Sequence, residues 1–129
     1  MTTANATPAE LLTAARAATG DRSPAWGTSW GRAAAFLARQ ALEQAISTAW
    51  LGGLAELSTA SFSDQLVCLP LLLGDEEAAR ARQAWYALSR ACHAHPYELA
   101  PALSEVVELL EAAERAVSSL SNERRTTAP

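Results

Sequence analysis

Apolar residues recur at intervals of three and four along most of the chain, and this spacing restricts the fold more than any other feature of the sequence. One segment carries five of them at steps of three, four, three and four: Ala78, Ala81, Trp85, Leu88 and Cys92. Such spacing places side chains on one face of an α-helix. No segment alternates apolar and polar residues as a half-buried strand does. The sequence therefore predicts an all-α fold.

The first two predicted helices are bounded by capping residues, glycine and proline. Thr7 and Pro8 fit the N-cap and first position of a helix that ends at Gly20. Ser29 fits the N-cap of a second helix that runs to Trp50. Alanine, the strongest helix former, is abundant in both segments.

Two further helices are predicted in the middle of the chain. The apolar segment Leu66–Leu73 predicts a short, fully buried helix that begins at Asp64. A fourth helix is expected to begin with Asp75 as its N-cap, followed by acidic residues that the helix dipole favours. It should end between His93 and His95, because Pro96 disfavours helical geometry in the residue before it.

The last predicted helix begins at Pro101 and buries apolar residues along one side as far as Leu120. Its other side carries four glutamates, which predict a solvated face or a surface for arginines of a partner chain: Glu105, Glu108, Glu111 and Glu114. Residues 121–129 read as a polar, frayed tail. The chain is thus expected to form one domain over residues 1–129, with its core at about 8–120, as a four- to five-helix up-and-down bundle.

Charge and cysteine content restrict the function and the compartment. The formal net charge is −4, which argues against a protein that coats nucleic acid by bulk electrostatics but leaves a local arginine cluster open. All ten basic residues are arginines, a bias typical of a GC-rich genome such as an actinobacterial one. Cys68 and Cys92 fall within helical segments and are predicted to be buried free thiols in a reducing cytoplasm.

Neither a targeting signal nor a membrane anchor is predicted. Residues 1–8 lack a basic region followed by an apolar stretch. The longest apolar run, Leu66–Leu73, contains Pro70 and is much shorter than the roughly 20 residues that a membrane-spanning helix needs. A cytoplasmic protein is expected.

The residues richest in chemistry lie where the fourth helix ends. Arg90 is followed by four residues, His95, one residue and Tyr97. This pattern resembles the HEPN superfamily, small helical bundles marked by an arginine, four to six residues and a histidine. Members that act as toxins paired with nucleotidyltransferase antitoxins extend the pattern to His-x-Tyr. The segment 91–101 is also similar to the motif region of an actinobacterial HEPN group, and the likeness extends over about residues 30–120 in helix layout.

The resemblance implies an endoribonuclease of the toxin or phage-defence type that needs neither metal nor cofactor. It implies that Arg90 holds the phosphate of an RNA substrate and that His95 acts as general acid or base, across the cleft of a homodimer. Tyr97 is the motif tyrosine that a partner nucleotidyltransferase would modify. In physical terms, an arginine fork suits phosphate and a histidine suits proton transfer near neutral pH.

Three further residues of the fourth helix are candidate supporting groups: Arg82, Tyr86 and His93. In an unbroken helix Arg90 and His95 would point about 140° apart. Pro96 removes this conflict, because it is expected to lift His95 off the end of the helix.

Other interpretations stay open. His93 fits an exposed histidine at a helix C-terminus, where a protonated ring meets the dipole favourably, and Tyr97 could merely order the corner. A metal site from Cys92, His93, His95 and Glu98 lacks a matching ligand pattern, so no metal is predicted. The four tryptophans are expected in the core or a dimer interface. Many active HEPN members carry a polar residue where this chain has Ala91, which favours a non-catalytic module that dimerises and binds a partner protein or a nucleotide.

Overall fold

The structure is a computed structural model that describes residues 6–21, 30–93 and 102–127, and all their side chains except those of Asp21 and residues 123–127. Over these residues the chain forms five α-helices and no strand. The helices are α1 (Pro8–Asp21), α2 (Trp30–Ala49), α3 (Phe62–Val67), α4 (Asp75–Cys92) and α5 (Leu103–Thr127). The prediction of an all-α bundle is confirmed.

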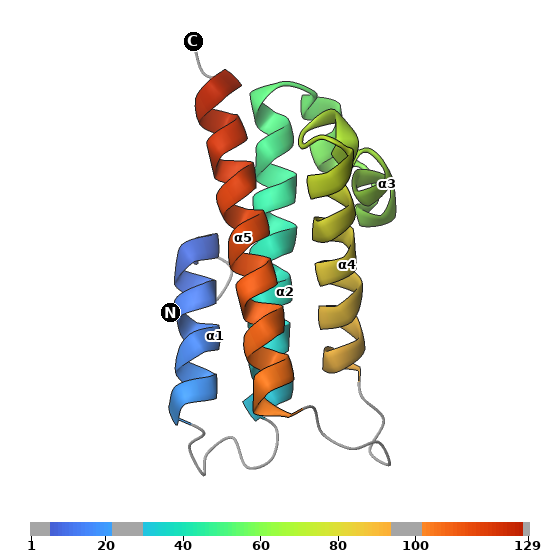
Figure 1. The fold of residues 1–129 in the computed structure, drawn as a ribbon. Helices are drawn as coiled ribbons and strands as arrows, with labels where there is room; N and C mark the ends of the chain where they lie inside the picture. Colours follow the sequence, from blue (N-terminus) through green and yellow to red (C-terminus); the bar gives the residue numbers. More distant parts are fainter. Residues whose placement is uncertain (1–5, 22–29, 94–101, 128–129) are drawn as a thin grey trace.

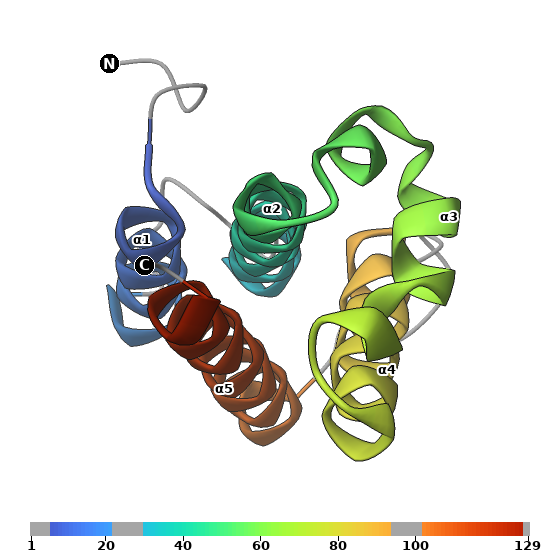
Figure 2. The ribbon, with the colours of Figure 1, turned by 90° about the horizontal axis from the view of Figure 1, so that it is seen from above.

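The four long helices run alternately down and up, with short α3 beside the upper end of α4 (Figure 1). Helix α2 packs against α1, α4 and α5, and α1 also contacts α5. Seen from above, α1, α2 and α5 form a tight triangle, and α4 stands at the far side of α2 (Figure 2). Among the described residues, no helix is both long enough and apolar enough to span a bilayer.

Alanine is the commonest residue among the buried apolar residues of the core. Helix α2 alone buries six alanines beside Leu42 and Ile46: Ala34, Ala35, Ala38, Ala41, Ala45 and Ala49. Small side chains let neighbouring helices approach to about 8 Å between axes. Trp50 is fully buried at the end of α2, whereas Trp30 and Trp85 pack on the edge of the core. The fourth tryptophan, Trp26, lies outside the described residues.

The prediction of one buried helix over Leu66–Leu73 is wrong. Helix α3 ends at Val67, and Leu69–Leu71 forms a separate 3₁₀ turn, because Pro70 lacks an N–H and disfavours α-helical geometry in the preceding residue. Leu66, Leu69 and Leu73 are buried, but Val67 and Leu71 are 69% and 67% exposed. The segment therefore covers the core with one side only.

Two other helix ends differ from expectation. Asp75 is the first residue of α4 rather than its N-cap, and the cap is Gly74, whose φ of 35° suits glycine. Helix α5 continues to Thr127 instead of fraying after Leu120, since no glycine or proline interrupts it there. The end of α4 agrees with the prediction, with His93 as its C-cap.

Candidate functional site

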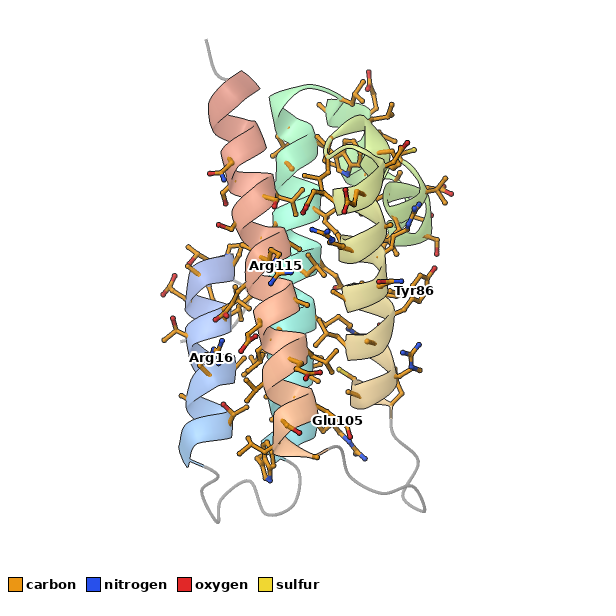
Figure 3. The ribbon with its side chains drawn as sticks, viewed as in Figure 1. Arg16, Tyr86, Glu105 and Arg115 are labelled. Atoms are coloured by element: carbon orange, nitrogen blue, oxygen red, sulfur yellow. The ribbon has the colours of Figure 1, made fainter. Side chains whose placement is uncertain are left out.

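Four predicted site residues share one face of α4, which we call the α4 crest: Arg82, Tyr86, Arg90 and His93. Arg82 is half-buried, and the other three are exposed. At 3.6 residues per turn they lie within about 80° of one another around the helix axis. Tyr86 is 52% exposed and points away from α5 (Figure 3). The crest leads directly into the motif segment that follows His93.

Arg90 holds no hydrogen bond or ion pair with any residue that the structure describes. It is exposed in the last turn of α4, where the helix dipole favours a cation. Its guanidinium fork is thus available to a ligand. His95 and Tyr97 lie outside the described residues, so the convergence of Arg90 with His95 stays a prediction.

A groove of about 680 Å³ runs between α4 and α5, and sequence reasoning missed it. Its floor is made of small residues from both helices: Ala81, Ala84, Ala87, Ala91, Ala112 and Ala116. Within each helix these alanines are three or four residues apart, and this spacing was the sequence signal that could have indicated the groove. Ala91, the residue after Arg90, also lines this groove.

The rim of the α4–α5 groove is charged. It includes Arg90 from the last turn of α4 and Glu105 from the first turn of α5, together with Glu108, Arg80 and Arg115. Figure 3 shows Glu105 at the start of α5 and Arg115 further along the same helix.

These rim charges are not equally free. Arg80 is neutralised on its own helix by Glu76 at 2.6 Å and Glu77 at 3.0 Å. By contrast, Glu105, Glu108 and Arg115 have no ion pair or hydrogen bond within the described parts of the chain.

A second polar cluster joins α2 to α4 on the opposite side of α4. Arg39 Nη1 lies 3.2 Å from His93 Nε2, and Arg39 Nε lies 3.5 Å from Glu43 Oε1. The Trp85 indole N–H donates to the same Glu43 oxygen at 3.0 Å. His93 is exposed at the C-terminal end of α4, as one interpretation expected.

Both cysteines are free thiols, and both are half-buried rather than fully buried. Burial raises the pKa of the Cys92 thiol, and nearby Arg39 opposes this only in part. The described residues contain no group of three or more side chains placed to hold a metal ion. His95 and Glu98, considered as ligands with Cys92 and His93, lie outside them.

No protein-family model matches the chain, and comparisons with curated proteins and with solved structures likewise give no match. The features of the chain that bear on its function are the sequence motif, the crest, the groove and the α2–α4 cluster.

Proposed function

We propose that this chain is a metal-independent endoribonuclease of the HEPN type, acting as a homodimer in toxin–antitoxin or phage-defence systems. The observation that carries the proposal is the exposed, unpaired guanidinium of Arg90 on the α4 crest, directly before the His95-x-Tyr97 motif. Arg82, Tyr86 and His93 on the same crest add groups that suit an RNA strand.

Side chains of the chain itself could carry out the cleavage of RNA. The ribose 2′-oxygen bonds to the adjacent phosphorus, and the bond from phosphorus to the 5′-oxygen of the next nucleotide breaks. His95 acts as general base and accepts the proton of the 2′-hydroxyl. His95 of the partner subunit acts as general acid and donates a proton to the leaving 5′-oxygen. Arg90 offsets the charge that develops on the phosphate oxygens. The products are a 2′,3′-cyclic phosphate and a 5′-hydroxyl.

Cleavage of total RNA in excess chelator tests this proposal. Arg90→Ala and His95→Ala should each abolish cleavage, while Arg80→Ala, which removes an exposed arginine of α4 that is paired with Glu76 and Glu77, should leave the rate unchanged. Far-UV circular dichroism should show the same helix content in all variants. A dimeric parent protein that cuts no RNA would contradict the proposal.

The α4–α5 groove favours a second candidate function, a non-catalytic module that binds a second copy of this chain. The charges along α5 are self-complementary, since Glu105 and Glu108 precede the cationic Arg115. Two α5 helices packed antiparallel bring Arg115 of one copy to Glu108 of the partner subunit, and the reverse. The alanine floor allows the close approach that helix packing needs. A dimeric module of this kind would dock a partner protein or a nucleotide rather than turn over RNA.

Sedimentation velocity tests this interface. Arg115→Glu should weaken the dimer, and so should Glu105→Arg combined with Glu108→Arg, because each places like charges opposite one another. All three changes together should restore association. Glu56→Arg, at an exposed position distant in sequence, should have no effect. A monomeric parent protein at millimolar concentration would overturn the interface.

A further inference from the structure

A continuous row of contacts crosses from α2 to α4 beside the crest, and we call it the α2–α4 strip: Phe36, Arg39, Glu43, Trp85 and Tyr86. The Arg39 guanidinium lies 6.0 Å from the centre of the Phe36 ring. The link from Arg39 through Glu43 to Trp85 is made by the ion pair and the indole hydrogen bond already described. The Trp85 and Tyr86 rings then meet edge to face, with centroids 5.2 Å apart.

The two ends of the α2–α4 strip are exposed aromatic rings, which is unusual for large apolar side chains that have a core to join. Phe36 is 43% exposed and Tyr86 is 52% exposed. Phe36 lies seven residues before Glu43, about 10 Å along α2. Glu43 accepts a hydrogen bond from Trp85, the residue before Tyr86. The Phe36 and Tyr86 rings are therefore separated by about that distance along the bundle.

The charge around the α2–α4 strip contrasts with the rest of the chain. Residues 30–49 and 82–93 together carry four arginines and one glutamate. That glutamate, Glu43, is already engaged by Arg39 and by Trp85. Residues 103–114 of α5, on the other side of α4, carry four glutamates and no basic residue. A polyanion is therefore attracted to the α2 side of the crest and repelled from the α5 side.

Exposed aromatic rings interleaved with arginines are what single-stranded RNA requires of a protein surface. Unstacked bases pack on phenylalanine and tyrosine rings, and arginines hold the phosphates between them. We infer that the α2–α4 strip binds single-stranded RNA, with bases stacked on Phe36 and Tyr86 and the backbone following Arg82 toward Arg90. The inference rests on the proposed endoribonuclease, because it supplies the path by which RNA reaches Arg90.

The experiment measures binding separately from cleavage. The probe is a fluorescein-labelled 10-nucleotide oligouridine with 2′-O-methyl riboses, which has no 2′-hydroxyl to attack. Fluorescence anisotropy at low salt with the full chain should show binding that weakens as salt increases. Phe36→Ala and Tyr86→Ala should each lower the affinity about ten-fold. Arg82→Ser should also weaken binding and reduce the salt dependence.

Matched controls lie away from the α2–α4 strip. Leu51→Ala removes an apolar side chain that is 64% exposed just after α2, and Arg80→Ser removes an exposed arginine of α4 that is paired with Glu76 and Glu77. Neither should change the affinity. Equal affinity for all variants, or no binding by the parent protein, would overturn the inference.

The outcomes for binding and for catalysis are distinguishable. If the methylated probe bound in a way that depended on Phe36 and Tyr86 but ordinary RNA was not cleaved, the inference of an RNA-binding strip would be supported and the endoribonuclease proposal would be contradicted. Cleavage of ordinary RNA that is unaffected by Phe36→Ala and Tyr86→Ala would retain the nuclease and overturn the strip.

Discussion

Arg16 of α1 and Glu114 of α5 form a two-pronged ion pair, with Nε 3.0 Å from Oε2 and Nη2 2.6 Å from Oε1. This ion pair joins α1 to α5, and Arg16 is labelled in Figure 3. The hydrogen bonds from Arg16 hold the pKa of the Glu114 carboxyl below its ordinary value. Both side chains remain about 40% exposed, at 40% and 39%, so water and salt screen much of the attraction.

The Arg16–Glu114 pair should make part of the stability depend on pH. A carboxyl whose pKa is lower in the folded chain than in the unfolded chain stabilises the fold above the unfolded pKa. That contribution disappears as the pH falls through the pKa of the folded chain. Glu114→Gln should therefore cost about 0.5–1 kcal/mol at pH 7 and almost nothing near pH 3. Urea unfolding at both pH values measures this. If Glu114→Gln lowered the free energy of unfolding equally at pH 7 and pH 3, the Arg16–Glu114 pair would not be the source of the pH dependence. An equal effect of Glu56→Gln would lead to the same conclusion.

The 3₁₀ turn at Leu69–Leu71 should show a sharp contrast between neighbouring apolar residues. Leu69 is fully buried and Val67 is 69% exposed. Leu69→Ala should lower the free energy of unfolding by about 2–5 kcal/mol, whereas Val67→Ala should change it by less than about 0.5 kcal/mol. Urea denaturation of both variants checks this. Similar costs would mean that the whole segment is buried, as its composition alone suggests.

The Cys92 thiol should react slowly while the chain is folded. Because burial raises its pKa, little of the reactive thiolate is present at pH 7.5. In a Cys68→Ser variant, alkylation by iodoacetamide should be several-fold slower for the folded chain than for the chain in urea. Mass spectrometry over time gives both rates. Equal rates would show that Cys92 is not shielded by the contact between α2 and α4.

Replacing Arg90 by lysine tests whether the fork of the guanidinium matters beyond its charge. Lysine keeps the charge but cannot bind two phosphate oxygens in one plane. Cleavage by Arg90→Lys should be about 100-fold slower than by the parent protein, and Arg80→Lys, at an arginine paired within α4, should cleave at the parent rate. Initial rates on an oligoribonucleotide in chelator measure the difference. A fully active Arg90→Lys variant would leave the residue with only an electrostatic role.

Local sequence signals determined most of the helix boundaries. Pro8 begins α1, Ser29 directly precedes α2, and α4 begins within one residue of its predicted start and ends with His93 as its cap, inside the predicted range. The spacing along α4 also placed Arg82, Tyr86, Arg90 and His93 on faces away from the apolar stripe, and they share the crest. These features depend on residues within one or two helical turns, so the sequence alone contains the information.

Contacts between helices were decided only by the tertiary structure. The periodicity of α5 predicted that Glu114 would face solvent or a partner chain, yet it pairs with Arg16 of the same chain. Likewise, Glu43 joins Arg39 to Trp85, and alanines of α4 and α5 line a groove as well as the core. Spacing along one helix shows which residues share a face. It does not show which other helix covers that face, because this depends on how all the helices pack together.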